Sequence, residues 1–161
     1  MRLLASLTLW MFVVGTGFIL GAGLYEMLVV VPFWAGNAPQ SLMEGNSFLR
    51  VPIRSGQVFW SVVTPCLGII ALAAFLTSFG MPAKEMIWRL AGTGLLLIMS
   101  IVTLVYFRPS IINMVVHHGA GRSGDALAAD AKMWVALNWL RIAAVAASLS
   151  MGVRALTLPT S

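Results

Sequence analysis

The sequence predicts an all-α membrane protein, a bundle of four antiparallel transmembrane helices with a short extra helix in the third connection. Hydrophobic residues make up 60% of the 161 positions and charged residues only 9%, and the mean hydropathy of +0.93 lies far above the range of soluble domains. Four segments each hold about 20 mainly apolar residues, enough for an α-helix to cross a bilayer. The connections are too short to fold alone, so we expect one domain over residues 1–161.

The first helix is expected over about residues 7–31. Its apolar run is longer than the core of a signal peptide, so we interpret it as a retained span. Gly17 and Gly21 form a GxxxG spacing that allows a neighbouring helix to approach closely. Pro32 is expected to end this helix, and a polar connection over residues 34–55 follows.

The second and third helices are expected over about residues 57–79 and 86–107. The turn of residues 80–82 between them is short enough to make them antiparallel neighbours. Pro109 then suits either a kink or the start of a new helix. A short helix from Ser110 to His118 fits the second possibility.

The fourth helix is expected to cross the membrane over about residues 133–156. The helix itself is expected to begin before the membrane, near Ser123. Ser123 can cap a helix N-terminus, and Asp125 has the favoured charge for a first turn. Tryptophans near the predicted helix ends suggest an interfacial belt of Trp34, Trp88 and Trp134.

Four spans place both termini on one side of the membrane. Basic residues flank short segments on the terminus side at Arg2, Lys84, Arg89 and Arg154, and lie in longer connections on the other side at Arg50, Arg54, Arg108, Arg122 and Lys132. Short loops carry most weight in the positive-inside rule. We therefore expect a bacterial inner (plasma) membrane protein with cytoplasmic termini.

Composition excludes several classes of function. The net charge of +5 could suggest nucleic acid, but the basic residues are scattered singly and form no basic face, so no nucleic-acid partner is expected. Cys66 is the single cysteine, which excludes an internal disulfide and a CxxC motif. The sequence also contains no P-loop or dinucleotide-binding fingerprint.

Two charged residues fall clearly inside the predicted spans, Glu26 in the first and Arg141 in the fourth. Glu26 precedes Pro32 by six residues and Arg141 follows Trp134 by seven, so each lies roughly 10 Å in from the same membrane face. A charge facing lipid at that depth is costly, so we expect the two groups to meet inside the bundle as an ion pair or in a wet cavity.

Further polar side chains lie at the same level and suggest one pocket that opens towards the longer connections, roofed by the first connection and by residues 110–118. The candidates on its helical stripes are Gln57, Trp60, Thr64, Thr103, Tyr106, Arg108, Trp134 and Asn138. Asn113 and His117 share a helix face and are also expected to face this pocket. The terminus-side half is mostly apolar, which argues against a proton or ion pathway through the bundle.

Two interpretations of Glu26 and Arg141 remain open, and they can coexist. They can simply clamp the first and fourth helices together, with Asn138 and Thr64 adding interhelical hydrogen bonds. Alternatively, Glu26 is a buried proton acceptor and Arg141 stabilises an anionic substrate or intermediate. No metal site is predicted at His117 and His118, because adjacent residues on a helix point about 100° apart.

Three segments resemble the anthrone oxygenase-like family of small four-helix membrane proteins. They are GAGLYEMLVVVPFW (Gly21–Trp34), FRPSIIN (Phe107–Asn113) and WVALNWLR (Trp134–Arg141), and the resemblance spans nearly the whole chain. Most bacterial members of the family have unknown function, and fungal members are associated with oxidising anthrones to anthraquinones without a dedicated cofactor. The family pattern points to Glu26, Pro32, Arg108, Pro109, Asn113, Trp134, Asn138 and Arg141.

The resemblance implies an oxidoreductase that acts on a hydrophobic aromatic small molecule without a cofactor. Glu26, Arg141 and Asn138 are the expected catalytic residues. The expected substrate-binding residues are Trp34, Trp60, Thr64, Tyr106, Arg108, Asn113, His117 and Trp134. The alternative is a non-enzymatic membrane protein, either a small-molecule binder or an accessory subunit, and its glycine-bearing faces also permit a homo-oligomer.

Overall fold

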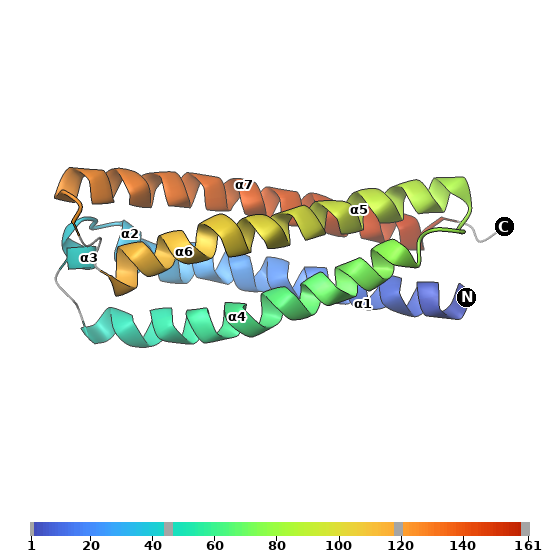
Figure 1. The fold of residues 1–161 in the computed structure, drawn as a ribbon, viewed down its shortest axis with the longest axis horizontal. Helices are drawn as coiled ribbons and strands as arrows, with labels where there is room; N and C mark the ends of the chain where they lie inside the picture. Colours follow the sequence, from blue (N-terminus) through green and yellow to red (C-terminus); the bar gives the residue numbers. More distant parts are fainter. Residues whose placement is uncertain (1, 44–46, 118–120, 159–161) are drawn as a thin grey trace.

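The computed structural model describes residues 2–43, 47–117 and 121–158, with the side chains of all of these except 43, 47–55 and 116. It is a bundle of long antiparallel helices in which α1 (Arg2–Tyr25) begins and α7 (Gly124–Leu156) ends at the same end (Figure 1). The described chain contains four candidate membrane spans, Arg2–Ala35, Gly56–Leu76, Ala83–Val115 and Gly124–Leu156. The predicted all-α bundle of four transmembrane helices is confirmed.

The first span does not end at Pro32 as the sequence suggested. Instead, α1 passes into a π-helical segment, η1 (Glu26–Val30), and then into α2 (Val31–Ala35). The Val31 N–H donates to the carbonyl of Glu26, five residues earlier. Proline has no N–H and its ring crowds the carbonyl four residues before it, so the wider π turn lets the helix continue past Pro32.

The third span passes its proline in the same way. α5 (Ala83–Val102) leads into η2 (Thr103–Phe107), α6 (Arg108–Ile111) and η3 (Ile112–Val116). The Arg108 N–H, immediately before Pro109, donates to the carbonyl of Thr103. The expected short helix at residues 110–118 therefore corresponds to α6 and η3, which follow η2 without a break, while His118 lies outside the described residues.

The remaining helices are α3 (Gln40–Met43) and α4 (Ser47–Leu76), of which α4 begins ten residues before the predicted position. The turn between α4 and α5 contains Gly80 at φ +94°, a conformation that favours glycine. At the start of α7, the Ser123 hydroxyl accepts a hydrogen bond of 3.3 Å from the Ala126 N–H. The predicted helix cap is thus confirmed.

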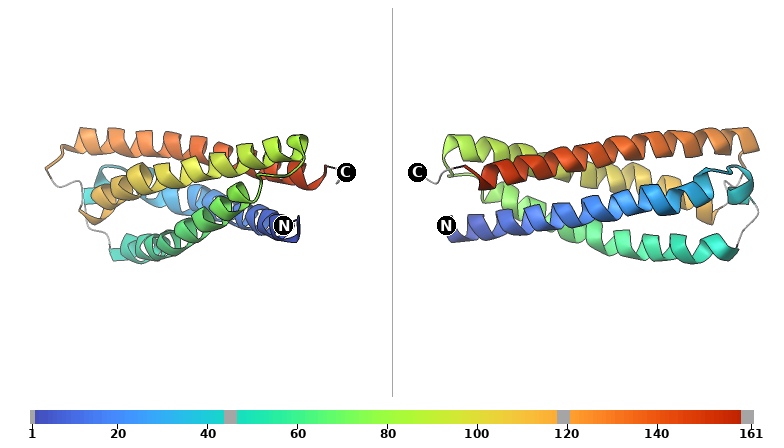
Figure 2. Two further views of the ribbon diagram at one scale, coloured as in Figure 1. Left: turned by 45° about the vertical axis from the view of Figure 1, so that its right-hand side comes forward. Right: turned by 180° about the vertical axis from the view of Figure 1, so that it is seen from behind.

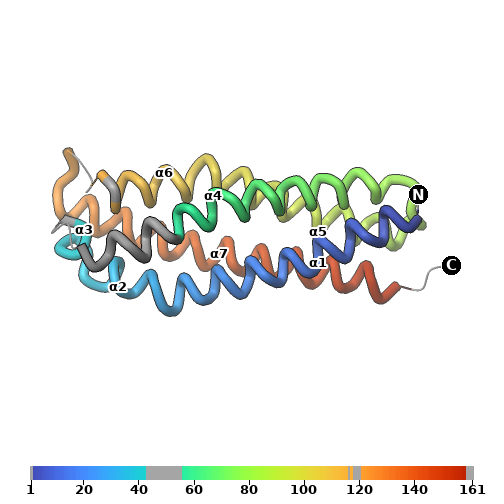
Figure 3. The backbone as a smooth tube through the Cα atoms, turned by 90° about the horizontal axis from the view of Figure 1, so that it is seen from below, coloured from blue at the N-terminus to red at the C-terminus, as the bar shows by residue number. Residues whose placement is uncertain are grey.

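The helices pack as a ring in which α7 contacts α1 and α5, and α4 contacts the same two helices from the other side. Figures 1 and 2 show α4 close to α5 at their shared turn and separated from α6 and α7 at its beginning. Seen from below, α4 crosses the bundle obliquely (Figure 3). The backbone of α4 is therefore farther from α6 and α7 at the far end than it is from α5 at the terminus end.

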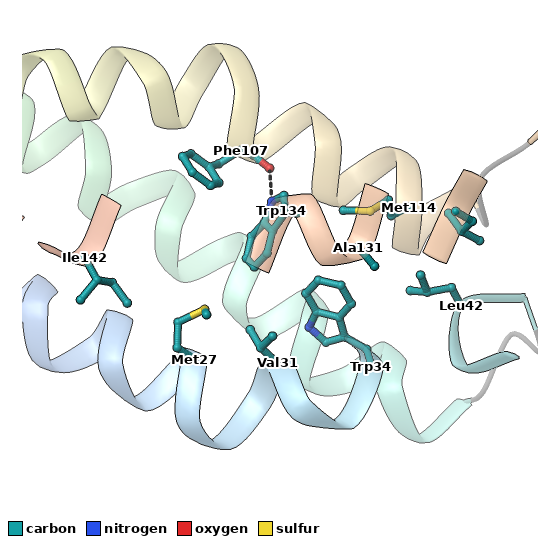
Figure 4. Packing of buried hydrophobic residues seen from close by; sticks show 10 residues of the cluster. Met27, Val31, Trp34, Leu42, Phe107, Met114, Ala131, Trp134 and Ile142 are labelled. Carbon is teal, nitrogen blue, oxygen red and sulfur yellow. Dashed lines mark hydrogen bonds between the residues drawn. The ribbon is translucent and has the colours of Figure 1, made fainter. Parts of the chain in front are cut away.

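Two hydrophobic clusters fill the bundle. The cluster nearer the termini consists of Leu9, Phe12, Ala71, Ala74, Leu96, Val145 and Ala155. The cluster at the far end, most of which is drawn in Figure 4, consists of Met27, Val31, Trp34, Leu42, Phe107, Met114, Leu127, Ala131, Trp134 and Ile142.

Close helix approach uses different glycines from those expected. A Cβ atom built on Gly92 would lie 3.0 Å from the Ser148 carbonyl oxygen, and one on Gly152 would lie 2.7 Å from the Phe12 ring. Gly17 and Gly21, in contrast, have no described atom of another part of the chain within 4 Å of such a Cβ. The GxxxG spacing of the first helix is therefore not a contact within this bundle.

Gly152→Ala is expected to lower the free energy of unfolding by about 1–3 kcal/mol, because its methyl group would enter the van der Waals space of the buried Phe12 side chain. Gly17→Ala, the matched control in open space, is expected to be neutral or slightly stabilising. Denaturant unfolding in detergent micelles measures both. Equal effects at the two positions would contradict the packing described here.

The terminus-side half is less apolar than expected, because it buries Arg89 of α5. This side chain is 4% exposed, donates 2.8 Å from Nη1 to the Ala5 carbonyl and pairs with Glu85 at 2.6 Å. The i, i+4 spacing of Glu85 and Arg89 is visible in the sequence, but the charge pattern predicted Arg89 at the membrane surface. The structure puts this ion pair between α1 and α5.

Candidate functional site

A cavity of about 510 Å³ lies near the far end of the bundle, where α4 diverges from the other helices. Its walls come from α1, η1 and α2, from residues 56–64 of α4, from η2 and α6, and from α7. Most of the lining is apolar. The side chains in it that carry a polar or charged group are Tyr25, Glu26, Trp34, Gln57, Trp60, Ser61, Thr64, Thr103, Arg108, Trp134 and Arg141.

Glu26 and Arg141 both line this cavity, and their opposite charges attract each other across it. Within the described chain the ion pairs are Glu85–Arg89 and Arg122–Asp130, so Glu26 and Arg141 do not approach within 4 Å. Of the two arrangements expected from the sequence, the shared cavity is the one observed. The two groups therefore border one cavity and are not neutralised by direct contact.

Aromatic rings hold the Arg141 guanidinium in place. Its central carbon lies 5.4 Å from the Trp60 ring centroid and 5.1 Å from that of Phe107, within the range of cation–π attraction. Nη1 is 3.5 Å from the Thr103 hydroxyl, a weak hydrogen bond. Trp60 also lines the cavity together with Glu26, so its ring borders the space that the two charged groups share.

The π-helical segment η1 positions Glu26, which is its first residue. The next residue, Met27, is 3% exposed, and its sulfur accepts a 2.8 Å hydrogen bond from the Asn138 amide of α7. Asn138 is fully buried and does not line the cavity. It therefore joins α7 to η1 next to Glu26, and its expected catalytic role stays a prediction.

Trp34 and Trp134 form an aromatic wall at the far end of the cavity. Their ring centroids are 5.3 Å apart at an angle of 67°, and the Trp134 indole donates 3.3 Å to the Phe107 carbonyl (Figure 4). They are only 2% and 4% exposed. The expectation that they belong to an interfacial belt is wrong, because they pack on each other inside the bundle.

The candidate residues from the sequence divide between two cavities. Trp34, Trp60, Thr64, Arg108 and Trp134 line the first cavity with Glu26 and Arg141. A second cavity of about 580 Å³ contains Tyr106, Asn113 and His117, together with the Arg122–Asp130 ion pair. Trp134 borders both cavities. The sequence predicted a single pocket, and the structure has two cavities in its place.

The described chain contains no group of three or more His, Cys, Asp or Glu side chains placed to hold a metal ion. His117 is exposed and borders the second cavity. His118, the other histidine considered for a metal, lies outside the described residues.

No family model, curated protein or solved structure matches this chain. The polar stripes predicted Gln57 and Thr103 at the level of the pocket, without a catalytic or substrate-binding role, and both line the first cavity. Phe107 is an apolar residue in an apolar span, so its contact with Arg141 had no sequence signal.

Proposed function

We propose that this membrane protein is an anthrone oxygenase-like oxidoreductase that acts on a hydrophobic aromatic small molecule in the first cavity. The observation that carries the proposal is that a carboxylate and a guanidinium face one mainly apolar cavity without forming a direct ion pair. Such a pair can remove a proton from a bound molecule and stabilise the anion that results. The resemblance of the segments around Glu26, Arg108 and Arg141 supports the same activity.

The size and surroundings of the cavity support a hydrophobic substrate. Its volume of about 510 Å³ lies within the range of about 300–1,000 Å³ typical of small-molecule sites. The lining also includes Phe18, Tyr25 and Leu104, which are 59%, 62% and 44% exposed on the outside of the bundle. In a bilayer these side chains face lipid, so we propose that the substrate enters laterally from the membrane.

The proposed reaction converts a ring CH₂ group opposite a ketone into a second carbonyl. Glu26 accepts the first proton from the CH₂ group, and Arg141 stabilises the negative charge that develops on the ketone oxygen. Dioxygen then takes up the electrons as a hydroperoxide forms on that carbon, with the proton returned from Glu26. Loss of water breaks the O–O bond and removes the second hydrogen, so one dioxygen gives one carbonyl and one water. Only the chain's own residues and dioxygen are needed.

Oxygen uptake by the purified protein in lipid nanodiscs tests this proposal. With anthrone as substrate, we expect uptake above the rate of protein-free nanodiscs, with one dioxygen consumed for each anthraquinone formed. Subtracting the protein-free rate matters, because anthrone also oxidises slowly by itself. A rate equal to the protein-free rate would remove the enzymatic proposal.

A non-enzymatic role is the second candidate, either a small-molecule binder or an accessory subunit. The observation that favours a subunit is the open space at Gly17 and Gly21 of α1, where a helix of a partner or of a second copy could pack. Binding of anthrone without oxygen uptake would favour a binder. Co-purification at a fixed stoichiometry would favour a subunit or a homo-oligomer.

We propose a location in a bacterial inner membrane with both termini in the cytoplasm. The support is the density of basic residues around the short terminus-side segments, at Arg2, Lys84 and Arg154. A fluorescent protein fused to the C-terminus, of a kind that matures only in the cytoplasm, should therefore be fluorescent. A dark fusion in correctly inserted protein would reverse this orientation.

A further inference from the structure

Two hydrogen-bond donors in the first cavity have no acceptor. Nε2 of Gln57 and Nε of Arg141 are both buried from solvent, and neither has a hydrogen-bond partner in the described part of the chain. Both side chains line the cavity. Buried polar atoms in proteins almost always have a partner, so two such atoms at one cavity indicate the polar group that an occupant should bring.

The missing group is an acceptor. A guanidinium nitrogen can only donate, so the requirement at Arg141 does not depend on how the Gln57 amide is oriented. The charges of the lining also favour an acceptor, because Arg108 and Arg141 contribute two cations against the single carboxylate of Glu26. An acceptor oxygen, neutral or negative, suits these surroundings, whereas an amine would add a third cation.

We infer that Gln57 is a ligand-binding residue, which together with Arg141 holds a carbonyl or oxyanion oxygen of the hydrophobic occupant. The inference rests on the proposed function only in taking this cavity as the ligand site, and it requires no turnover. It also assigns a direction to the bound molecule, with its oxygen towards Gln57 and Arg141. The group that loses a proton then lies towards Glu26.

A matched pair of ligands tests this assignment without any reaction. Xanthone and xanthene are tricyclic molecules of nearly equal shape, and only xanthone has a carbonyl group. Binding is measured without oxygen, in nanodiscs, by quenching of tryptophan fluorescence, since Trp34, Trp60 and Trp134 line the cavity. We expect the protein to bind xanthone about tenfold more tightly than xanthene, the preference typical of one satisfied buried hydrogen-bonding group.

Gln57→Leu should remove most of this preference while xanthene still binds, which also shows that the variant is folded. Val58→Leu is the matched control, because Val58 is the next residue of α4, is 63% exposed and does not line the cavity; it should retain the preference. The assignment is overturned if the protein does not distinguish the two ligands, or if Gln57→Leu distinguishes them as well as the unaltered protein. Absence of oxygen uptake alongside a Gln57-dependent preference would remove the oxidoreductase proposal and support this one.

Discussion

Glu26→Gln is expected to lower oxygen uptake with anthrone at least about 100-fold, the usual contribution of a general base. Glutamine has nearly the same shape as glutamate, but its amide cannot accept the substrate proton. The residue starts η1 and its neighbour Met27 is anchored by Asn138, so the backbone around it should be preserved. Initial rates in nanodiscs, corrected for the protein-free rate, measure the effect.

The control for this change is Asp125→Asn, the same loss of a carboxylate in the exposed first turn of α7. It should leave the rate unchanged. Binding of xanthone by the Glu26→Gln variant separates lost chemistry from a lost cavity, because this ligand has no proton to give up. Full activity of Glu26→Gln would show that the carboxylate is a structural group, as in the interpretation in which it only clamps helices.

Arg89→Met is expected to lower the free energy of unfolding by about 3–5 kcal/mol, the cost of removing one partner from a buried ion pair. Arg89 is 4% exposed and its partner Glu85 13%, so the substitution leaves a carboxylate without a counter-charge between α1 and α5. The hydrogen bond to the Ala5 carbonyl is lost as well. Unfolding by SDS in mixed micelles measures the loss.

The double variant Glu85→Gln with Arg89→Met should recover part of this stability, because the unpaired charge is then absent. Arg122→Gln is the matched control, since Arg122 is 54% exposed in its pair with Asp130 and such pairs contribute about 0–1 kcal/mol. If Arg89→Met were no more destabilising than Arg122→Gln, the buried pair would have no role in holding the bundle.

The sequence by itself determined the number of spans and the common level of the two charged groups along the bundle. Apolar length decides which segments can cross a bilayer, and the constant rise per residue fixes how far a side chain lies from the helix end. Glu26 and Arg141 could therefore be placed at one level before any packing was known. The Ser123 cap is equally local, because it depends on neighbouring residues alone.

The tertiary structure decided how those side chains are directed around each helix and which neighbours they meet. A π turn holds one extra residue, so η1 and η2 rotate the residues that follow them away from an α-helical projection. Asn113 and His117, which follow η2, line the second cavity and not that of Glu26 and Arg141. The divergence of α4, which opens that cavity, depends on packing between helices far apart in the sequence. The same packing buries Arg89, which the distribution of charge along the chain had placed at the membrane surface.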